Sequence, residues 1–105
     1  MAQTFGEKIR ALRKENGLTL DQLAEKTESS KSYIWELENK NPPRPSADKI
    51  ARIAAALGVT SDYLMDEKDQ KKETAQDLAF YRKYRTVDPA TKDKVRQMLD
   101  LMIKK

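Results

Sequence analysis

The chain has 105 residues, a formal net charge of +4, and 36% charged against 38% hydrophobic residues. This length suits one small domain with an extension, because a second independent core needs more residues. The sequence lacks both Cys and His, which excludes a disulfide framework, a thiolate zinc site and the commonest general base. We therefore expect no enzyme, no cofactor and no metal site. No apolar run spans a bilayer, so a soluble, cytoplasmic protein without membrane contact is expected.

Two capping boxes predict the first two helices. The segments at residues 4–7 and 19–22 have the forms T-x-x-E and T-x-x-Q, which satisfy backbone donors at a helix start. Apolar residues follow each box at helical spacing. The pattern predicts one helix over residues 5–16, stopped by Gly17, and a short second helix that ends at residue 26 or 27.

A third helix is predicted to begin after Ser29 or Ser30, with Ile34 and Leu37 on its apolar face. The sequence NPPRP at residues 41–45 forbids helix, because proline lacks the backbone donor and restricts the residue before it.

The remaining helices also have clear start and stop signals. Ser46 caps a fourth helix that ends at Gly58, and Thr60 caps a short fifth helix. The segment DEKDQKKET, residues 66–74, contains no apolar residue and predicts a solvated linker or a frayed helical start. Two further helices follow, the second capped by Asp88 with Pro89 in its first turn. The whole chain is predicted to be all-α, with domains at residues 1–66 and 67–105.

The second and third helices, joined by a short turn, form a helix-turn-helix pattern. Residues 5–64 resemble the five-helix domain of the phage repressor and Cro-type family, also called the xenobiotic-response-element family. The matching motifs are LT and LA at residues 18–19 and 23–24, SKSYI at 30–34, LEN at 37–39 and LGVTSDYL at 57–64. The resemblance implies a five-helix lambda-repressor-like domain. The two further helices lie outside the resemblance and are predicted to form a C-terminal helical hairpin. The resemblance also implies that the third helix reads DNA and that homodimers bind operators with two similar half-sites.

The resemblance assigns contacts with base edges to Lys31, Ser32 and Glu36. Lysine can donate to guanine, serine can donate or accept, and a carboxylate can accept from cytosine N4. The alternative is that these three residues form an ordinary solvated helix face. Contacts with phosphate are expected from residues near the start of the second helix, in the third helix and after it: Thr19, Tyr33, Asn39, Lys40 and Arg44.

The resemblance also implies an ion pair between Arg13 and Glu38 that fixes the third helix against the first. Two positions depart from the family pattern. Leu20 stands where the family commonly has Gln, so the resemblance does not extend the phosphate contact of that Gln to this position. Glu28 stands where the family often has Gly, so the turn must avoid a left-handed backbone or tolerate strain, and the side chain is expected to point away from DNA.

Trp35 lies beside Glu36 and has three alternatives: contact with DNA, with the NPPRP loop or with the C-terminal extension. Packing within its own protein is favoured, because large aromatic side chains are usually buried.

The extension contains two amphipathic stripes that a small hairpin cannot bury alone. A second copy of the chain is the favoured partner, which predicts a homodimer and a palindromic operator on double-stranded DNA. The alternatives are a hairpin packed against its own domain and an antitoxin whose extension binds a toxin while the domain autoregulates. The predicted dimer interface contains Phe80, Tyr81, Tyr84, Val95, Met98, Leu99 and Met102. We therefore expect a sequence-specific transcriptional regulator, acting as a repressor.

Overall fold

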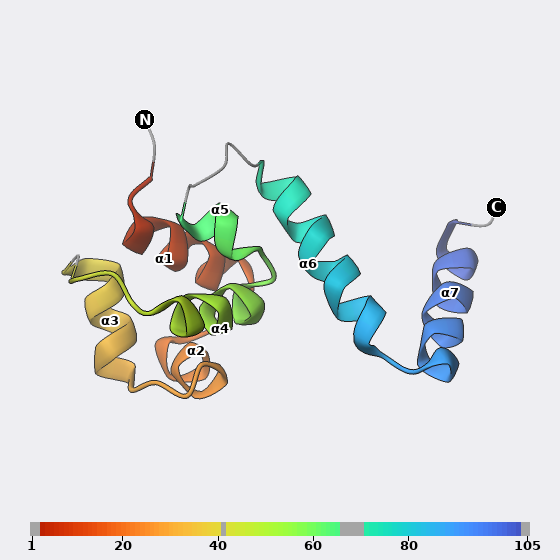
Figure 1. The fold of residues 1–105 in the computed structure, drawn as a ribbon, viewed down its shortest axis with the longest axis horizontal. Helices are drawn as coiled ribbons and strands as arrows, with labels where there is room; N and C mark the ends of the chain where they lie inside the picture. The colour runs from red at the N-terminus through yellow and green to blue at the C-terminus, as the bar shows by residue number, and fades with distance from the viewer. Residues whose placement is uncertain (1–2, 41, 66–70, 104–105) are drawn as a thin grey trace.

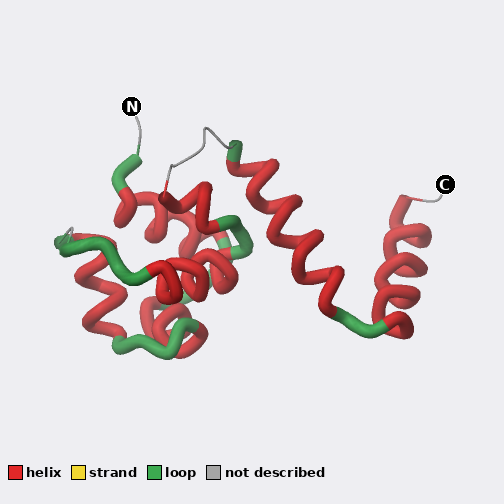
Figure 2. The backbone as a smooth tube through the Cα atoms, in the orientation of Figure 1, coloured by secondary structure: helices red, strands yellow, loops and turns green. Residues whose placement is uncertain are grey.

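The computed structural model describes residues 3–40, 42–65 and 71–103, which form seven α-helices and no strand (Figures 1 and 2). The all-α prediction is confirmed, and the predicted helix boundaries agree within one or two residues. None of the described helices is long and apolar enough to cross a membrane. The helices are α1 (Phe5–Glu15), α2 (Leu20–Lys26), α3 (Lys31–Asn39), α4 (Ala47–Leu57), α5 (Ser61–Met65), α6 (Lys72–Thr86) and α7 (Pro89–Ile103).

Local capping interactions explain where the helices begin. Both predicted capping boxes are present, with the hydroxyl oxygens of Thr4 and Thr19 accepting from backbone N–H groups three residues later. Ser30, one of the two predicted candidates, caps α3. Asp88 caps α7, since its carboxylate accepts from the backbone N–H of Thr91 at 2.8 Å. Hydrogen bonds from the side chain and backbone of Thr91 lower the pKa of this carboxyl below its ordinary value of 3.8.

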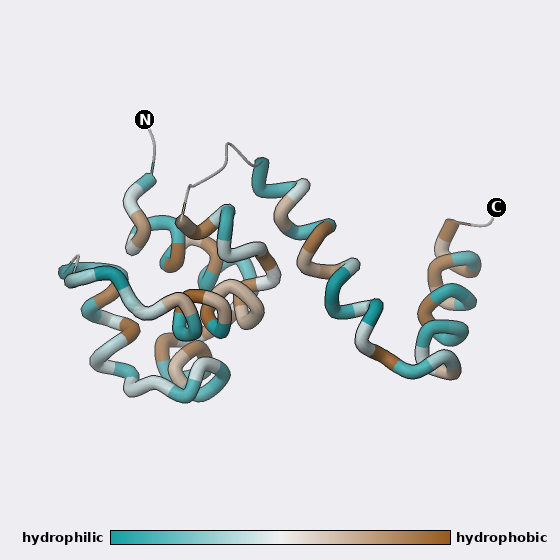
Figure 3. Tube along the Cα trace, in the orientation of Figure 1, coloured by the Kyte–Doolittle hydropathy of each residue, from teal (hydrophilic) through white to brown (hydrophobic). Residues whose placement is uncertain are grey.

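Helices α1 to α5 enclose one hydrophobic core, to which each of the five contributes buried apolar residues. Along these helices, hydrophobic and hydrophilic positions follow each other in short runs (Figure 3). Ile9, Leu23, Ile34 and Ile53 have no exposed surface, and each stabilises the fold by about 1.5–3 kcal/mol. The core also includes Ala75 of α6, which is 0% exposed, so the core extends beyond residue 66.

The charged segment before Ala75 is described only in part. Residues 66–70 lie outside the described residues, so the linker predicted for them stays a prediction. The part from Lys72 onward is helical, and the Lys72 ammonium lies 3.1 Å from the Glu15 carboxylate of α1. This ion pair and Ala75 join the start of α6 to the domain.

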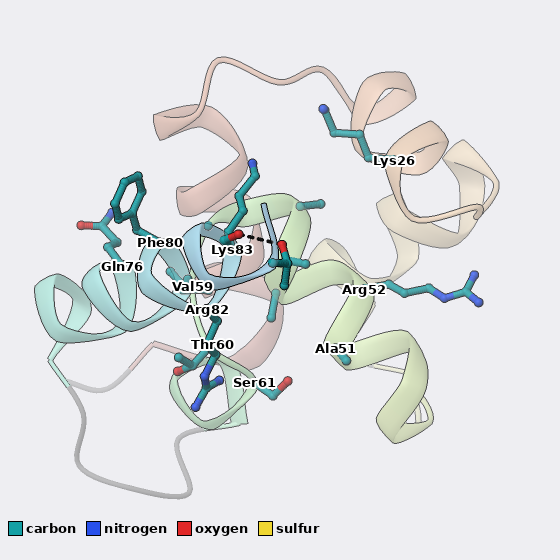
Figure 4. A pocket seen from close by; sticks show the side chains of 16 residues that line it. Lys26, Ala51, Arg52, Val59, Thr60, Ser61, Gln76, Phe80, Arg82 and Lys83 are labelled. Carbon is teal, nitrogen blue, oxygen red and sulfur yellow. Dashed lines mark hydrogen bonds between the residues drawn. The ribbon is translucent and has the colours of Figure 1, made fainter. Parts of the chain in front are cut away.

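Beyond Ala75, a groove of about 850 Å³ separates α6 from α4 (Figure 4). Its walls come mainly from α4, the connection between α4 and α5, and α6, with single residues from the end of α2 and the start of α5. The charged residues that line it are all cationic: Lys26, Arg52, Arg82 and Lys83. Only the first turns of α6 therefore belong to the core.

A short connection joins α6 to α7, as predicted for a helical hairpin, but the two helices diverge from that connection (Figure 1). They meet near Tyr84, whose ring centroid lies 5.6 Å from the Lys92 ammonium and 5.8 Å from the Arg96 guanidinium. The large apolar side chains of α7 are mostly exposed, including Met98 at 62% and Met102 at 80%. A hairpin packed along its length within one chain is therefore not what the structure contains.

Gly6 allows α1 to cross α3 closely. A Cβ atom at this position would lie 2.3 Å from the carbonyl oxygen of Leu37 and 2.9 Å from that of Glu38. Both neighbours are backbone atoms of α3, so they cannot rotate away as a flexible side chain would.

We therefore expect Gly6→Ala to destabilise the protein by about 2–3 kcal/mol in urea unfolding, since overpacking forces the two helices apart. Ala11→Ser is the matched control, because Ala11 is exposed on the same helix and its substitution should change stability by less than about 0.5 kcal/mol. Equal stabilities for Gly6→Ala and the control would contradict this account of the helix crossing.

Candidate nucleic-acid interface

The two faces of α3 differ sharply in exposure. Ile34 is 0% and Leu37 2% exposed, and both pack into the core between α1 and α2. The opposite face presents Lys31, Ser32 and Glu36 to solvent. Because the inner face is fully packed, the outer face is held on a rigid helix, as a DNA-reading helix requires.

The three residues predicted to contact base edges lie together on this outer face. The Lys31 ammonium is 3.7 Å from the Asp21 carboxylate of α2, and both side chains are more than half exposed. An exposed pair at this distance contributes little free energy, so Lys31 can leave Asp21 to contact a base.

The residues predicted to contact phosphate lie on three segments: the start of α2, α3 with its C-terminal end, and the loop before α4. Thr19 caps α2 and is exposed, while its hydroxyl oxygen accepts from the Gln22 N–H at 3.1 Å. Arg44 is exposed in the loop before α4, and Asn39 and Lys40 are exposed at the end of α3. Tyr33 differs from the others, since it is half-buried and packs against the core. The arrangement brings cations to the end of α3 and to the next loop.

Trp35 is not packed inside the protein, so the favoured prediction for this residue was wrong. Its side chain is 43% exposed on α3, and the Lys40 ammonium lies 5.5 Å from its ring centroid. Asn39 donates its side-chain amide to the Trp35 carbonyl oxygen at 2.9 Å. Among the described helices, α3 lies at the edge of the domain, with α1, α2 and α4 to one side of it (Figure 1). A ring that points away from these helices stays exposed.

The predicted ion pair between Arg13 and Glu38 is present and bidentate. Arg13 donates Nε and Nη2 to the two Glu38 carboxylate oxygens at 2.7 and 3.1 Å. The Glu38 side chain is only 2% exposed. Arg13 also donates Nη1 to the Leu18 carbonyl oxygen at 3.0 Å, so one guanidinium connects α1, the segment before α2, and α3.

The turn between α2 and α3 adopts the strained alternative. Glu28 has a φ of 54°, a left-handed conformation that a side chain disfavours. The Glu28 carboxylate forms an ion pair with Arg52 of α4. At the other departure from the family pattern, Leu20 is half-buried and packs against the core.

Three residues that shape this interface had no predicted role: Gly6, Lys49 and Arg52. Each acts through a contact with a residue more than 20 positions away in the sequence. Neither helical periodicity nor a capping motif reports contacts of this kind.

Removing Arg13 would leave a buried carboxylate without a partner. We expect Arg13→Met to destabilise the protein by about 3–5 kcal/mol, measured by urea unfolding at neutral pH. The double variant Arg13→Met/Glu38→Leu should recover much of that loss, because the uncompensated charge is gone. A double variant no more stable than Arg13→Met would show that the buried charge is not the cause.

Comparisons with known proteins agree with this geometry. A family model of the helix-turn-helix domain matches residues 6–70. The transcriptional regulator SinR of Bacillus licheniformis is 35% identical over 72 residues, which cover 69% of this chain and 65% of SinR. The immunity repressor of Bacillus phage phi105 is 39% identical over 70 residues, which cover 67% of this chain and 48% of the repressor. The matches thus span about two thirds and one half of these relatives.

Two solved structures of SinR resemble the present one. SinR in complex with DNA matches 60% of this chain and 100% of that chain, with 35% identity and a TM-score of 0.57. The SinR/SinI complex matches 94% of each chain, with 30% identity and a TM-score of 0.57. From the family match and these relatives, the chain belongs to the helix-turn-helix transcriptional regulators of the phage repressor and xenobiotic-response-element type, which bind DNA.

Proposed function

We propose that this regulator is a repressor that binds a palindromic operator as a homodimer. In this proposal residues 1–66 read DNA and residues 67–105 hold two chains together in the cytoplasm. The observation that carries the proposal is the division of α3 into an inner face fixed in the core and an exposed polar outer face.

In the proposed complex, α3 lies in the major groove with its first turns toward the bases. Lys31 donates to guanine, Ser32 donates or accepts, and Glu36 accepts from cytosine N4. Thr19, Tyr33, Asn39, Lys40 and Arg44 contact phosphates on either side of the groove, with backbone N–H groups at the start of α2 as further donors. Base contacts then give specificity, and phosphate contacts set the position of the protein.

The proposal of a homodimer rests on the exposed apolar side chains of α6 and α7. Phe80 is 62%, Tyr81 55%, Met98 62%, Leu99 54% and Met102 80% exposed. Tyr84 and Val95, the other two residues of the predicted interface, are half-buried. Large apolar side chains exposed in this number are typical of a protein interface. A symmetric dimer would place two recognition helices about 34 Å apart, which matches one turn of DNA.

A partner protein is the second candidate for this apolar surface. The SinR/SinI complex, in which a relative of this chain is bound to another protein, favours it. The antitoxin alternative falls in the same class. Purification of the native protein separates the candidates, since a tightly bound second polypeptide in a fixed ratio supports the partner, and a pure dimer supports self-association.

Selection of binding sites from random duplex DNA tests specific recognition. A consensus with two-fold symmetry is expected from the wild-type protein. Enrichment of no sequence over bulk DNA would contradict the proposal.

Two lysines should respond differently on the selected duplex. Lys31→Ala should relax the preference at one base pair of each half-site, with a loss of about 1–3 kcal/mol in binding free energy. Lys40→Ala should weaken binding to all sequences alike and lower the slope of log K against log salt by about one for each recognition helix. Binding titrations at several salt concentrations measure both effects. Uniform losses from both variants would contradict the assigned division between base and phosphate contacts.

The dimer interface can be tested with substitutions on α7. Leu99→Asp should shift the dimer to monomer in sedimentation equilibrium, because a dimer would have to bury the new charge. Gln97→Glu is the matched control, since Gln97 is an exposed polar residue on the same helix and lies outside the predicted interface. An unchanged dimer for Leu99→Asp would contradict the proposed interface.

A further inference from the structure

We propose that Lys49 and Arg52 of α4 are positioning residues that fix the turn between α2 and α3 and so set the selectivity of the recognition helix. The two residues lie three positions apart on α4 and face the turn. The inference rests on the proposed sequence-specific function, because selectivity is the property that it explains.

Lys49 is connected to three consecutive residues of the turn. Its ammonium donates to the Thr27 carbonyl oxygen at 3.0 Å, to the Ser29 hydroxyl oxygen at 2.8 Å and to the Glu28 carbonyl oxygen at 3.4 Å. The ammonium thereby satisfies carbonyl groups at the end of α2 that lack a helical partner. Its positive charge also interacts favourably with the negative end of the α2 helix dipole.

The turn forms a connected network around this ammonium. Thr27 is 0% exposed, and its hydroxyl donates to the carbonyl oxygens of Leu23 and Ala24 and lies 3.1 Å from the Ser29 hydroxyl oxygen. Ser29 directly precedes Ser30, the residue that caps α3. A displacement of the turn is therefore transmitted to the first turn of the recognition helix.

Arg52 acts on the strained residue of the same turn. Glu28 holds a φ of 54°, and its carboxylate pairs with the Arg52 guanidinium, which also lies 3.3 Å from the Asp48 carboxylate. The pair joins the Glu28 side chain to α4. Both side chains are exposed, so this pair adds less free energy than the Lys49 hydrogen bonds to the turn. The strained turn thus has two restraints from α4, one on its backbone and one on its side chain.

The orientation of α3 affects selectivity, because a hydrogen bond to a base edge is lost when the donor is displaced by more than a small distance. Side chains extend about 5–6 Å from a helix axis, so a rotation of about 10° moves their ends by roughly 1 Å. Donor–acceptor distances in good hydrogen bonds vary by only about 0.5 Å. Lys49 also lies 6.0 Å from the ring centroid of Tyr33 in the first turn of α3, which adds a direct contact with this helix.

Direct contact with phosphate is a competing role for Lys49, and the geometry disfavours it. The side chain is half-buried, and its three N–H groups match three acceptors of the turn. A positioning residue of this kind should release no counterion when DNA binds, so it should not contribute to the salt dependence.

The test compares Lys49→Met with Lys83→Met in the full chain, using the selected duplex and bulk DNA at several salt concentrations. Lys83 is exposed on α6 and forms no ion pair within the described part of the chain, so its variant controls for the lost charge. Lys49→Met should lower affinity for the selected duplex about tenfold relative to the control, with less than twofold change on bulk DNA and an unchanged salt slope. Ser29→Ala, which removes one acceptor, should lower selectivity in the same direction by a smaller factor.

Two outcomes would overturn the proposal. Equal losses on both DNAs with a lower salt slope would make Lys49 a phosphate contact. An unchanged ratio of the two affinities, with lower stability in urea, would leave Lys49 a purely structural role. Amide hydrogen exchange without DNA separates this inference from the proposed function: Lys49→Met should accelerate exchange at residues 27–31 even if the wild-type protein selects no DNA sequence.

Discussion

The bidentate ion pair between Arg13 and Glu38 is the contact on which the proposed DNA-reading surface depends. Glu38 has a side chain that is 2% exposed, so its charge would be very unfavourable without the two guanidinium donors. The same guanidinium holds the Leu18 carbonyl oxygen. Because hydrogen bonds of this geometry are directional, the pair selects one orientation of α3 over others with similar apolar burial. Gly6 permits the close crossing at which the pair can form.

The orientation of α3 also explains why the proposed DNA-reading helix can contain two glutamates. Glu38 points inward and is neutralised by Arg13, so it adds no repulsion toward phosphate. Glu36 lies on the exposed face, where a carboxylate can accept from a base. The cations around the helix are at its ends: Lys31 in its first turn and Lys40 just after its last residue. Trp35 remains exposed between them, with its ring beneath the Lys40 ammonium.

What could be predicted from the sequence depended on the distance between interacting residues. Caps at Thr4, Thr19 and Ser46 were predicted correctly, because each acts on a backbone group three residues away. The Arg13–Glu38 pair followed only from a family resemblance, since spacing along the chain does not bring these residues together. Lys49 was missed, because its partners lie 20–22 positions away in another helix. Burial of Trp35 was predicted from the usual behaviour of aromatic residues, and this residue is instead 43% exposed on α3.

The domain and the C-terminal extension differ in how much of their apolar surface is buried within one chain. Helices α1 to α5 bury their apolar faces within one chain, whereas α7 has no buried residue. The start of α6 is held by Ala75 in the core and by the ion pair between Lys72 and Glu15. These contacts fix the direction in which α6 leaves the domain. The orientation of a partner bound to α6 and α7 relative to the domain would therefore depend on this direction. In the proposed dimer, the contacts of α3 with bases are properties of one chain, and the spacing of the two half-sites depends on the angle at which α6 leaves the core.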